Sequence, residues 1–399
     1  MLQVKDPVRV IGRPLGRLLS KPHTFCGRSR SSTQSSFSHP IVLLQPSEEG
    51  KYFGEDCSPH LSASGEKWRI FMKTGFACLR LARLHTLMAW AIFPAPAIYT
   101  IVLYHSSKSI HLHAIEKVIG CLRLSVVSFL CVMSYRAAGL AWDDLIDRDF
   151  DAQVRRSMKR PLPSGDISVD GALLYIILQT GLTFILLQVL AAQEVFLSFV
   201  LSGALFGIYP YLKRWTHYTQ LFGSLLITMG VLQGWLFCAT TYEPIYGIAP
   251  GWLHAAAILR RDWLQILPIF LMEFVYELAH ELVYGCQDTE EDITIGLHSL
   301  SILCGYEKSR RLSTTLASCF CFLLAVCSKN AKVLAWPALL IPPVLLVRWT
   351  HKLDLSVSSC CAQWAVAAIK VKILVTFSLL TLFVLKEMDI LLLMGMGCL

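Results

Sequence analysis

Long apolar segments dominate this chain and restrict the folds open to it. A helix needs about 20 apolar residues to cross the hydrocarbon core of a bilayer. Inside a membrane, only helices and closed barrels satisfy every backbone hydrogen bond. Apolar runs centre on residues 86–104, 124–139, 171–190, 195–212, 221–238, 264–283, 312–327, 333–347 and 373–385. The sequence therefore predicts an all-α, multi-pass transmembrane bundle of about nine helices.

Composition supports a membrane setting and argues against nucleic acid as a partner. Of the 399 residues, 54% are hydrophobic and 16% are charged, whereas soluble domains carry about 25% charged residues. The formal net charge is +8, but the basic residues lie mostly in the N-terminal part and in the loops, as the positive-inside rule predicts. We expect a lipid bilayer around the protein and no nucleic acid.

The chain divides into a polar tail and one membrane domain. Residues 1–70 are Ser-rich and include Arg9, Arg13 and Arg17 at four-residue spacing. The arginine spacing is compatible with a mitochondrial presequence. A basic tail held near anionic lipid is the alternative, because prolines interrupt the amphipathic helix that a presequence would form. Residues 71–399 form the transmembrane domain. The endomembranes and the mitochondrial inner membrane are both open as its location.

Two acidic clusters stand beside these apolar runs: D-D-L-I-D-R-D-F-D at Asp143 to Asp151 and D-T-E-E-D at Asp288 to Asp292. Ionisable groups near a membrane interior are costly and are usually functional. Carboxylates so close together repel each other unless a cation lies between them. Mg²⁺ suits such a site, because it takes oxygen ligands and commonly bridges carboxylates to substrate phosphates.

Helical spacing selects the metal ligands within these clusters. If a helix extends from the second span, the aspartates of the first cluster share one of its faces. In the second cluster only one helix face can point inward, and Asp288 and Asp292 share that face. The predicted ligands are Asp143, Asp144, Asp147, Asp151, Asp288 and Asp292. Glu291 is a further candidate, and Glu290 is expected to face solvent. The alternative interpretation is a pair of solvated loops whose acidic residues pair with neighbouring arginines.

Helix parity places both clusters on the same side of the membrane. The first follows the second predicted helix and the second follows the sixth, so an even number of crossings separates them. Loops after even-numbered helices also carry most of the loop Lys and Arg residues, which favours the cytosolic face or its organellar equivalent. The two clusters can therefore share a site and hold Mg²⁺ on a diphosphate.

Basic side chains follow the first cluster and the fourth predicted helix. The segment V-R-R-S-M-K-R-P-L-P-S-G offers Arg156 and Arg160, four residues apart. Guanidinium groups bind phosphate oxygens bidentately and would neutralise a diphosphate leaving group. Lys213 and Arg214, in Y-P-Y-L-K-R, are either further phosphate ligands or anchors at a membrane end.

Four separated elements resemble one known family. The segment A-G-L-A-W-D-D-L-I-D-R-D-F-D-A-Q-V-R-R-S-M-K-R-P-L-P-S-G-D-I-S at Ala138 to Ser168 resembles the first signature of the UbiA-type intramembrane prenyltransferases, N-D-x-x-D-x-x-x-D followed by V-x-R-T-x-x-R-P. Y-P-Y-L-K-R, then G-V-L-Q-G-W at Gly230 to Trp235, then Y-G-C-Q-D-T-E-E-D-I-T-I-G-L-H-S at Tyr284 to Ser299 are similar to later family elements, in order. The resemblance covers about residues 75–390.

This resemblance implies a nine-helix bundle in which the aspartate motifs bind Mg²⁺ and an isoprenyl diphosphate. The implied reaction ionises the allylic diphosphate, and an electron-rich aromatic carbon then attacks the carbocation. By position, the implied catalytic residues are Asp144, Asp147, Asp151, Asp288 and Asp292, and the basic residues that face the diphosphate are Arg156, Arg160, Lys213 and Arg214.

The chain departs from the family pattern at three places. Asp143 replaces the leading Asn, Glu281 replaces the Asp that begins D-T-I-Y-A, and residues 83–87 replace R-x-D-K-P. Trp142, directly before the aspartates, is similar to the fungal branch of meroterpenoid pathways. That branch implies transfer of a farnesyl or related chain to a polyketide-derived phenolic acid, which we place first.

Three alternatives stay open. Transfer to 4-hydroxybenzoate in ubiquinone biosynthesis comes second and is favoured by the S-G-D-I-S segment and the possible presequence. A membrane terpene cyclase of the same superfamily would close the carbocation on itself without an aromatic acceptor. A scaffold or transporter would have acidic loops with a structural role only.

Overall fold

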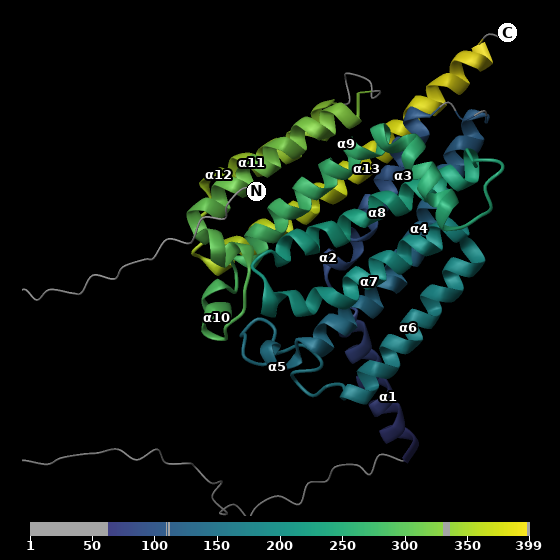
Figure 1. Ribbon diagram of the computed structural model, residues 1–399. Coiled ribbons are helices and arrows are strands. Elements are labelled where there is room, and N and C mark those ends of the chain that lie inside the picture. Colours follow the sequence, from purple (N-terminus) through teal and green to yellow (C-terminus); the bar gives the residue numbers. More distant parts are fainter. Residues whose placement is uncertain (1–62, 109, 111, 330–335, 397–399) are drawn as a thin grey trace, which may run out of the picture. The chain divides into compact units, whose positions relative to one another are not determined.

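The computed structural model describes residues 63–108, 110, 112–329 and 336–396, and the regular elements in this part are helices (Figure 1). In chain order they are α1 (Ala63–Leu81), α2 (Leu87–Ala91), α3 (Pro94–Ser107), α4 (Ala114–Ile146), α5 (Arg148–Asp151), α6 (Val169–Leu190), α7 (Gln193–Trp215), α8 (Thr219–Tyr242), α9 (Trp252–Gly285), α10 (Thr289–Thr294), α11 (Leu300–Cys327), α12 (Trp336–Lys352) and α13 (Ser358–Met396). The polar tail predicted for residues 1–70 lies largely outside the described residues, and α1 begins within its last part.

The predicted apolar segments coincide with helices, apart from residues 333–335, which lie outside the described part. The first segment is divided between α2 and α3. Pro94 begins α3, and proline is tolerated there because the N–H that it lacks would have no partner in the first helical turn. Within the described residues, six helices are long and apolar enough to cross a bilayer: α4, α6, α7, α8, α11 and α13. The all-α, multi-pass prediction is confirmed.

Helix α8 lies at the centre of the bundle. In its most apolar window, 78% of the residues are buried, against 11% for α6, so α6 presents its apolar side chains to lipid. Helix α8 packs against α3, α7 and α9. Its contact with α3 depends on Gly234, where an added Cβ would lie 2.4 Å from the Ala97 carbonyl oxygen. Small residues allow such close approach between membrane helices.

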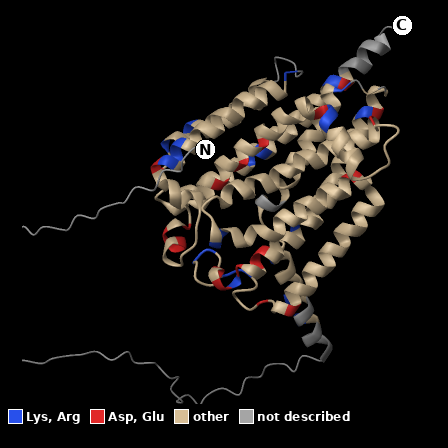
Figure 2. Cartoon of the chain, viewed as in Figure 1, with Lys and Arg blue, Asp and Glu red and all other residues tan. Residues whose placement is uncertain are grey.

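Both acidic clusters lie at the same end of the bundle (Figure 2). The first lies at the α4–α5 junction and the second in α10, and α6, α7, α8 and α9 separate them. An even number of helices thus returns the chain to the same end, as parity predicts. The continuous helix that we expected through Asp151 is not observed, because Asp147 leaves helical geometry (φ −88°, ψ 2°) between α4 and α5.

Candidate active site

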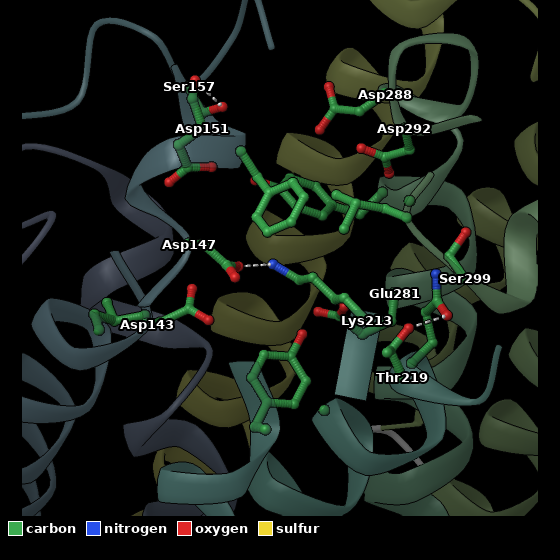
Figure 3. Close-up of a pocket in the computed structure, with 18 of the residues that line it drawn as sticks. Asp143, Asp147, Asp151, Ser157, Lys213, Thr219, Glu281, Asp288, Asp292 and Ser299 are labelled. Atoms are coloured by element: carbon green, nitrogen blue, oxygen red, sulfur yellow. Dashed lines mark hydrogen bonds and ion pairs between the residues drawn. The ribbon is translucent and has the colours of Figure 1, made fainter. Parts of the chain in front are cut away.

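One pocket gathers residues of both acidic clusters (Figure 3). Its wall comes from α4, α5, α7, α8, α9 and α10, from the loops after α5 and α10, and from the segments before and after α2. Eight of the ten predicted site residues line it: Asp143, Asp147, Asp151, Arg156, Arg160, Lys213, Asp288 and Asp292. Asp144 and Arg214 are absent from this lining. The structure therefore brings together most of the side chains that the sequence selected.

Lys213 and Asp147 connect α7 to the α4–α5 junction. The Lys213 Nζ lies 2.5 Å from the Asp147 Oδ2 (Figure 3). The Asp147 side chain is only 4% exposed, so burial raises the pKa of this carboxyl although Lys213 opposes the shift. Burial likewise raises the pKa of Asp151 against the attraction of Arg160. Both carboxylates thus lie where a nearby cation is favoured.

Asp144 faces a neighbouring cavity that also includes Arg80, Arg83 and Arg160. Its Oδ1 accepts hydrogen bonds from Arg83 at 2.6 Å and from Arg160 at 3.0 Å. Arg160 also donates to Asp151 at 2.6 Å, so this guanidinium links the two cavities. Arg83 was not among the predicted site residues, although the altered R-x-D-K-P pattern begins at it.

Arg83 reaches Asp144 through an unusual backbone conformation. It is the one non-glycine residue of the described chain with a positive φ, at 54°. A side chain makes this left-handed region costly, and such conformations occur at functional sites. Its guanidinium also lies 3.9 Å from Asp143. Arg83 thus contributes a positive charge to the first acidic cluster from the turn between α1 and α2.

Arg156 connects the loop between α5 and α6 to the second acidic cluster. Its Nε lies 3.0 and 2.9 Å from the two Asp288 carboxylate oxygens, and its Nη1 donates to the Tyr284 hydroxyl at 2.8 Å. One helical turn further on, burial and the negative charge of Asp288 raise the pKa of Asp292 to about 6. Of the two predicted metal ligands in the second cluster, Asp288 is therefore paired with an arginine, whereas burial and repulsion disfavour the charge of Asp292.

Arg214 supports the α4–α5 junction from outside the pocket. Its Nη2 donates to the Ile146 carbonyl oxygen at 2.8 Å, and its guanidinium lies 4.9 Å from the centre of the Phe150 ring. Its distance to the Asp147 Oδ1 is 3.8 Å. The structure thus gives Arg214 contacts that hold the first cluster in place.

The donor set fits a cation bound together with a phosphorylated substrate. Asp143 Oδ1 and Asp144 Oδ2 are buried and have no hydrogen-bond partner, and a buried charged oxygen is costly without one. Within the part of the chain that the structure describes, no group of three His, Cys, Asp or Glu side chains is arranged to hold a metal alone. Mg²⁺ commonly uses one or two carboxylates, waters and substrate phosphates.

An apolar wall continues from the charged rim of the pocket toward the bundle interior. It consists of Ile92, Phe93, Leu140, Phe206, Leu226 and Ile227. Phe93 and Phe206 stack with their ring centres 6.1 Å apart. The pocket can therefore take a ligand with an anionic head and an apolar chain.

The model of the UbiA prenyltransferase family matches residues 95–374. The chain belongs to this family. The match includes both acidic clusters and the basic loop between them. Family membership and the six apolar helices of the described chain identify an integral membrane protein.

Curated relatives include bacterial 4-hydroxybenzoate octaprenyltransferases. The protein of Idiomarina loihiensis is 30% identical over 184 residues, which cover 46% of this chain and 58% of that protein. The protein of Blochmanniella pennsylvanica is 30% identical over 257 residues, 64% of this chain and 77% of that protein. The chain thus spans just over half of the first relative and about three quarters of the second.

Solved structures share the fold. The apo structure of a UbiA homologue from Aeropyrum pernix K1 matches 72% of this chain and 95% of its own, with a TM-score of 0.58 and 17% identity. A UbiA homologue from Archaeoglobus fulgidus, bound to GPP and Mg²⁺, matches 76% of this chain and 99% of its own, with a TM-score of 0.52 and 16% identity. The helix arrangement is therefore that of UbiA proteins.

Proposed function

We propose that this protein transfers an isoprenyl group from its diphosphate to an aromatic acceptor and uses Mg²⁺ to do so. The observation that carries the proposal is the single pocket in which two carboxylate clusters and five Lys and Arg side chains, among them Arg156, Arg160 and Lys213, meet an apolar wall. The charged rim suits a metal–diphosphate head, and the wall suits an isoprenyl chain. The family match and the GPP- and Mg²⁺-bound homologue support this assignment.

The pocket residues can promote departure of the diphosphate. Bound Mg²⁺, held by the aspartates of both clusters, would supply positive charge to the diphosphate oxygens. Arg156, Arg160 and Lys213 donate hydrogen bonds to these oxygens while the bond between the allylic carbon and oxygen breaks. Both electrons of that bond leave with the diphosphate. The apolar wall keeps water away from the carbocation until the acceptor attacks.

The curated relatives favour 4-hydroxybenzoate as the acceptor over the polyketide-derived phenolic acid that we placed first. Trp142 was the residue that favoured the polyketide-derived acid. Its Nε1 donates a hydrogen bond to the Gly207 carbonyl oxygen at 3.1 Å, and it is not part of the pocket lining. This hydrogen bond connects α4 to α7. Prenylation of 4-hydroxybenzoate would place the protein in the mitochondrial inner membrane, and a meroterpenoid role would place it in endomembranes.

Product analysis tests the proposal. Membranes that contain the protein are incubated with Mg²⁺ and isoprenyl diphosphates of several lengths, and with 4-hydroxybenzoate, a polyketide-type phenolic acid or no acceptor. Prenylated 4-hydroxybenzoate is expected. A cyclic hydrocarbon formed without acceptor would instead identify a terpene cyclase, and prenylation of the polyketide-type acid alone would restore the meroterpenoid role.

Diphosphate release tests the proposed metal site separately. EDTA should abolish it and added Mg²⁺ should restore it, because clustered aspartates and an uncompensated diphosphate repel each other. Asp147→Ala and Asp288→Ala should each remove it, whereas Glu290→Ala, at an exposed position outside the pocket lining, serves as the control. Unchanged release in both aspartate variants would favour a scaffold or transporter.

A further inference from the structure

A group of buried ionisable side chains extends from the pocket into the membrane interior. Glu281 lines the pocket, and Glu277 and Glu273 lie one and two turns earlier on the same helix, α9. Lys372 of α13 donates a hydrogen bond to Glu277 and lies 2.5 Å from Glu273. The Tyr99 hydroxyl donates to Glu273 at 2.5 Å. Charged groups at such depth are costly and usually serve a function.

His280 lies between the pocket carboxylate and this buried group. Its Nδ1 is 3.9 Å from Glu281 Oε1 and 4.0 Å from Glu277 Oε2. Neither ring nitrogen of His280 has a hydrogen-bond partner among the described residues, and Glu277 Oε2 has none either. Its ring stacks against Tyr284, another pocket residue, with ring centres 5.9 Å apart. Unsatisfied buried polar atoms of this kind are rare.

The buried group carries an excess of negative charge, which favours the uptake of a proton. Three carboxylates, of Glu273, Glu277 and Glu281, face one ammonium, that of Lys372, so a neutral His280 gives a formal charge of −2. The deeper carboxylates share the ammonium. Glu281 makes no ion pair with a lysine or arginine in the described part of the chain, and the neutral His280 ring lies 3.9 Å from its Oε1.

Glu281 differs in this respect from pocket aspartates that have basic partners. Asp147 pairs with Lys213, Asp151 with Arg160 and Asp288 with Arg156. These pairs contain the carboxylates and the cations that a metal–diphosphate head would engage. Glu281 lies within α9, seven residues before Asp288, and lines the pocket with a side chain that is 19% exposed. It is therefore placed to meet the acceptor.

On the basis of the proposed function, we propose that Glu281 is the base that removes the ring proton of the aromatic acceptor. The allylic carbon forms a bond to the ring carbon as the diphosphate leaves with the electron pair of the broken C–O bond. The ring C–H bond then breaks, its electron pair restores the aromatic ring, and the proton is transferred to a Glu281 carboxylate oxygen. His280 and the Lys372 group are positioning residues, which hold this face of α9 in place.

Glu281→Gln tests the assignment, because it keeps the shape of the side chain and removes its basicity. Two quantities are measured with Mg²⁺ and isoprenyl diphosphate: release of diphosphate, with prenyl alcohol as the water-capture product, and formation of prenylated acceptor. We expect diphosphate release within a few-fold of wild type and transfer reduced about 100-fold or more, the usual contribution of a general base. Glu281→Asp should recover part of the transfer.

An acceptor deuterated at the reacting ring position separates a base from a structural residue. Wild type should show no deuterium effect on transfer, because loss of the ring proton follows slower steps. Glu281→Gln should show a normal effect, because proton loss becomes rate-limiting. Glu290→Gln, an acidic residue of α10 that is exposed and outside the pocket lining, should match wild type in every readout.

Two results would overturn the assignment. Glu281→Gln could transfer at the wild-type rate, or it could lose release and transfer equally with no deuterium effect; if it does not fold, the same two results are scored on Glu281→Ala, which also lacks the base. A wild-type protein that releases no diphosphate with Mg²⁺ would be a different outcome, because it rejects the proposed function itself and the role of Glu281 with it.

Discussion

At the scale of the residue, the geometry of Arg156 explains why an arginine occupies this position. Its planar group contacts both Asp288 oxygens and the Tyr284 hydroxyl at once. Lysine keeps the charge but cannot reproduce this arrangement. We expect Arg156→Lys to raise the KM for the isoprenyl diphosphate about tenfold, since a hydrogen bond to a charged group contributes about 1.5–3 kcal/mol. Steady-state kinetics at saturating acceptor measures this change.

The neighbouring residue supplies the control for this prediction. The Arg155 side chain is 93% exposed and pairs with Glu291 outside the pocket lining. Exposed ion pairs contribute little, so Arg155→Lys should leave the KM unchanged. Equal KM values for the two variants would show that Arg156 acts only as a diffuse positive charge.

Sequence spacing identified most of the site residues but not their orientations. The aspartates stand out because carboxylates are rare beside apolar spans, and eight of ten candidates line one pocket. Asp144 lines a neighbouring cavity, and the helix breaks at Asp147, whereas periodicity assumes one unbroken helix that faces one site. Arg83 was not predicted as a site residue, because it reaches Asp144 from a left-handed backbone conformation. No residue pattern in this segment indicates that conformation.

At the scale of the element, close packing of α8 on α3 depends on the absence of a side chain at Gly234. An alanine Cβ there would lie 2.4 Å from a backbone oxygen of α3, so one helix would have to move. Such overpacking typically costs about 1–3 kcal/mol. We expect Gly234→Ala to lower the midpoint of thermal unfolding in detergent. Gly181→Ala on α6, where no atom lies within 4 Å, should not lower it.

The ion group between α9 and α13 makes a second prediction at this scale. Lys372→Met would leave Glu273 and Glu277 buried without their shared cation, and breaking a buried ion pair from one side costs about 3–5 kcal/mol. We expect a large drop in the thermal midpoint in detergent. Lys370→Met removes a lysine two residues earlier that is exposed, so it should have little effect. Equal midpoints would mean that the ammonium contributes no stability.

Apolar run length predicted the helices because the bilayer imposes that length on any spanning element. It did not predict the full extent of α9, whose 34 residues include charged positions outside the apolar run. The Lys372 group was also not predicted, since its partners lie 95 and 99 residues away on another helix. Helix pairings of this kind depend on three-dimensional packing and leave no local pattern.

At the scale of the whole membrane domain, the even number of helices between the acidic clusters predicts labelling from one side only. Cysteines introduced at Asp149 and Glu290, both exposed, should react with a charged maleimide from the same side of sealed, uniformly oriented vesicles. A cysteine at Tyr246, 90% exposed in the loop between α8 and α9, should react from the other side. Labelling of positions 149 and 290 from opposite sides would contradict the topology.

The ion pairs of the pocket have a consequence for the order in which ligands bind. Each carboxylate in the pairs Lys213–Asp147 and Arg156–Asp288 already has a cationic partner. Metal alone would displace the basic side chains, and diphosphate alone would displace the carboxylates, so either leaves charges unmatched. When both bind, the carboxylates pair with the metal and the basic side chains pair with the diphosphate, so the net charge of the pocket changes little. We therefore predict that metal and donor bind with positive thermodynamic coupling and that the pocket discriminates against a diphosphate that arrives without its cation.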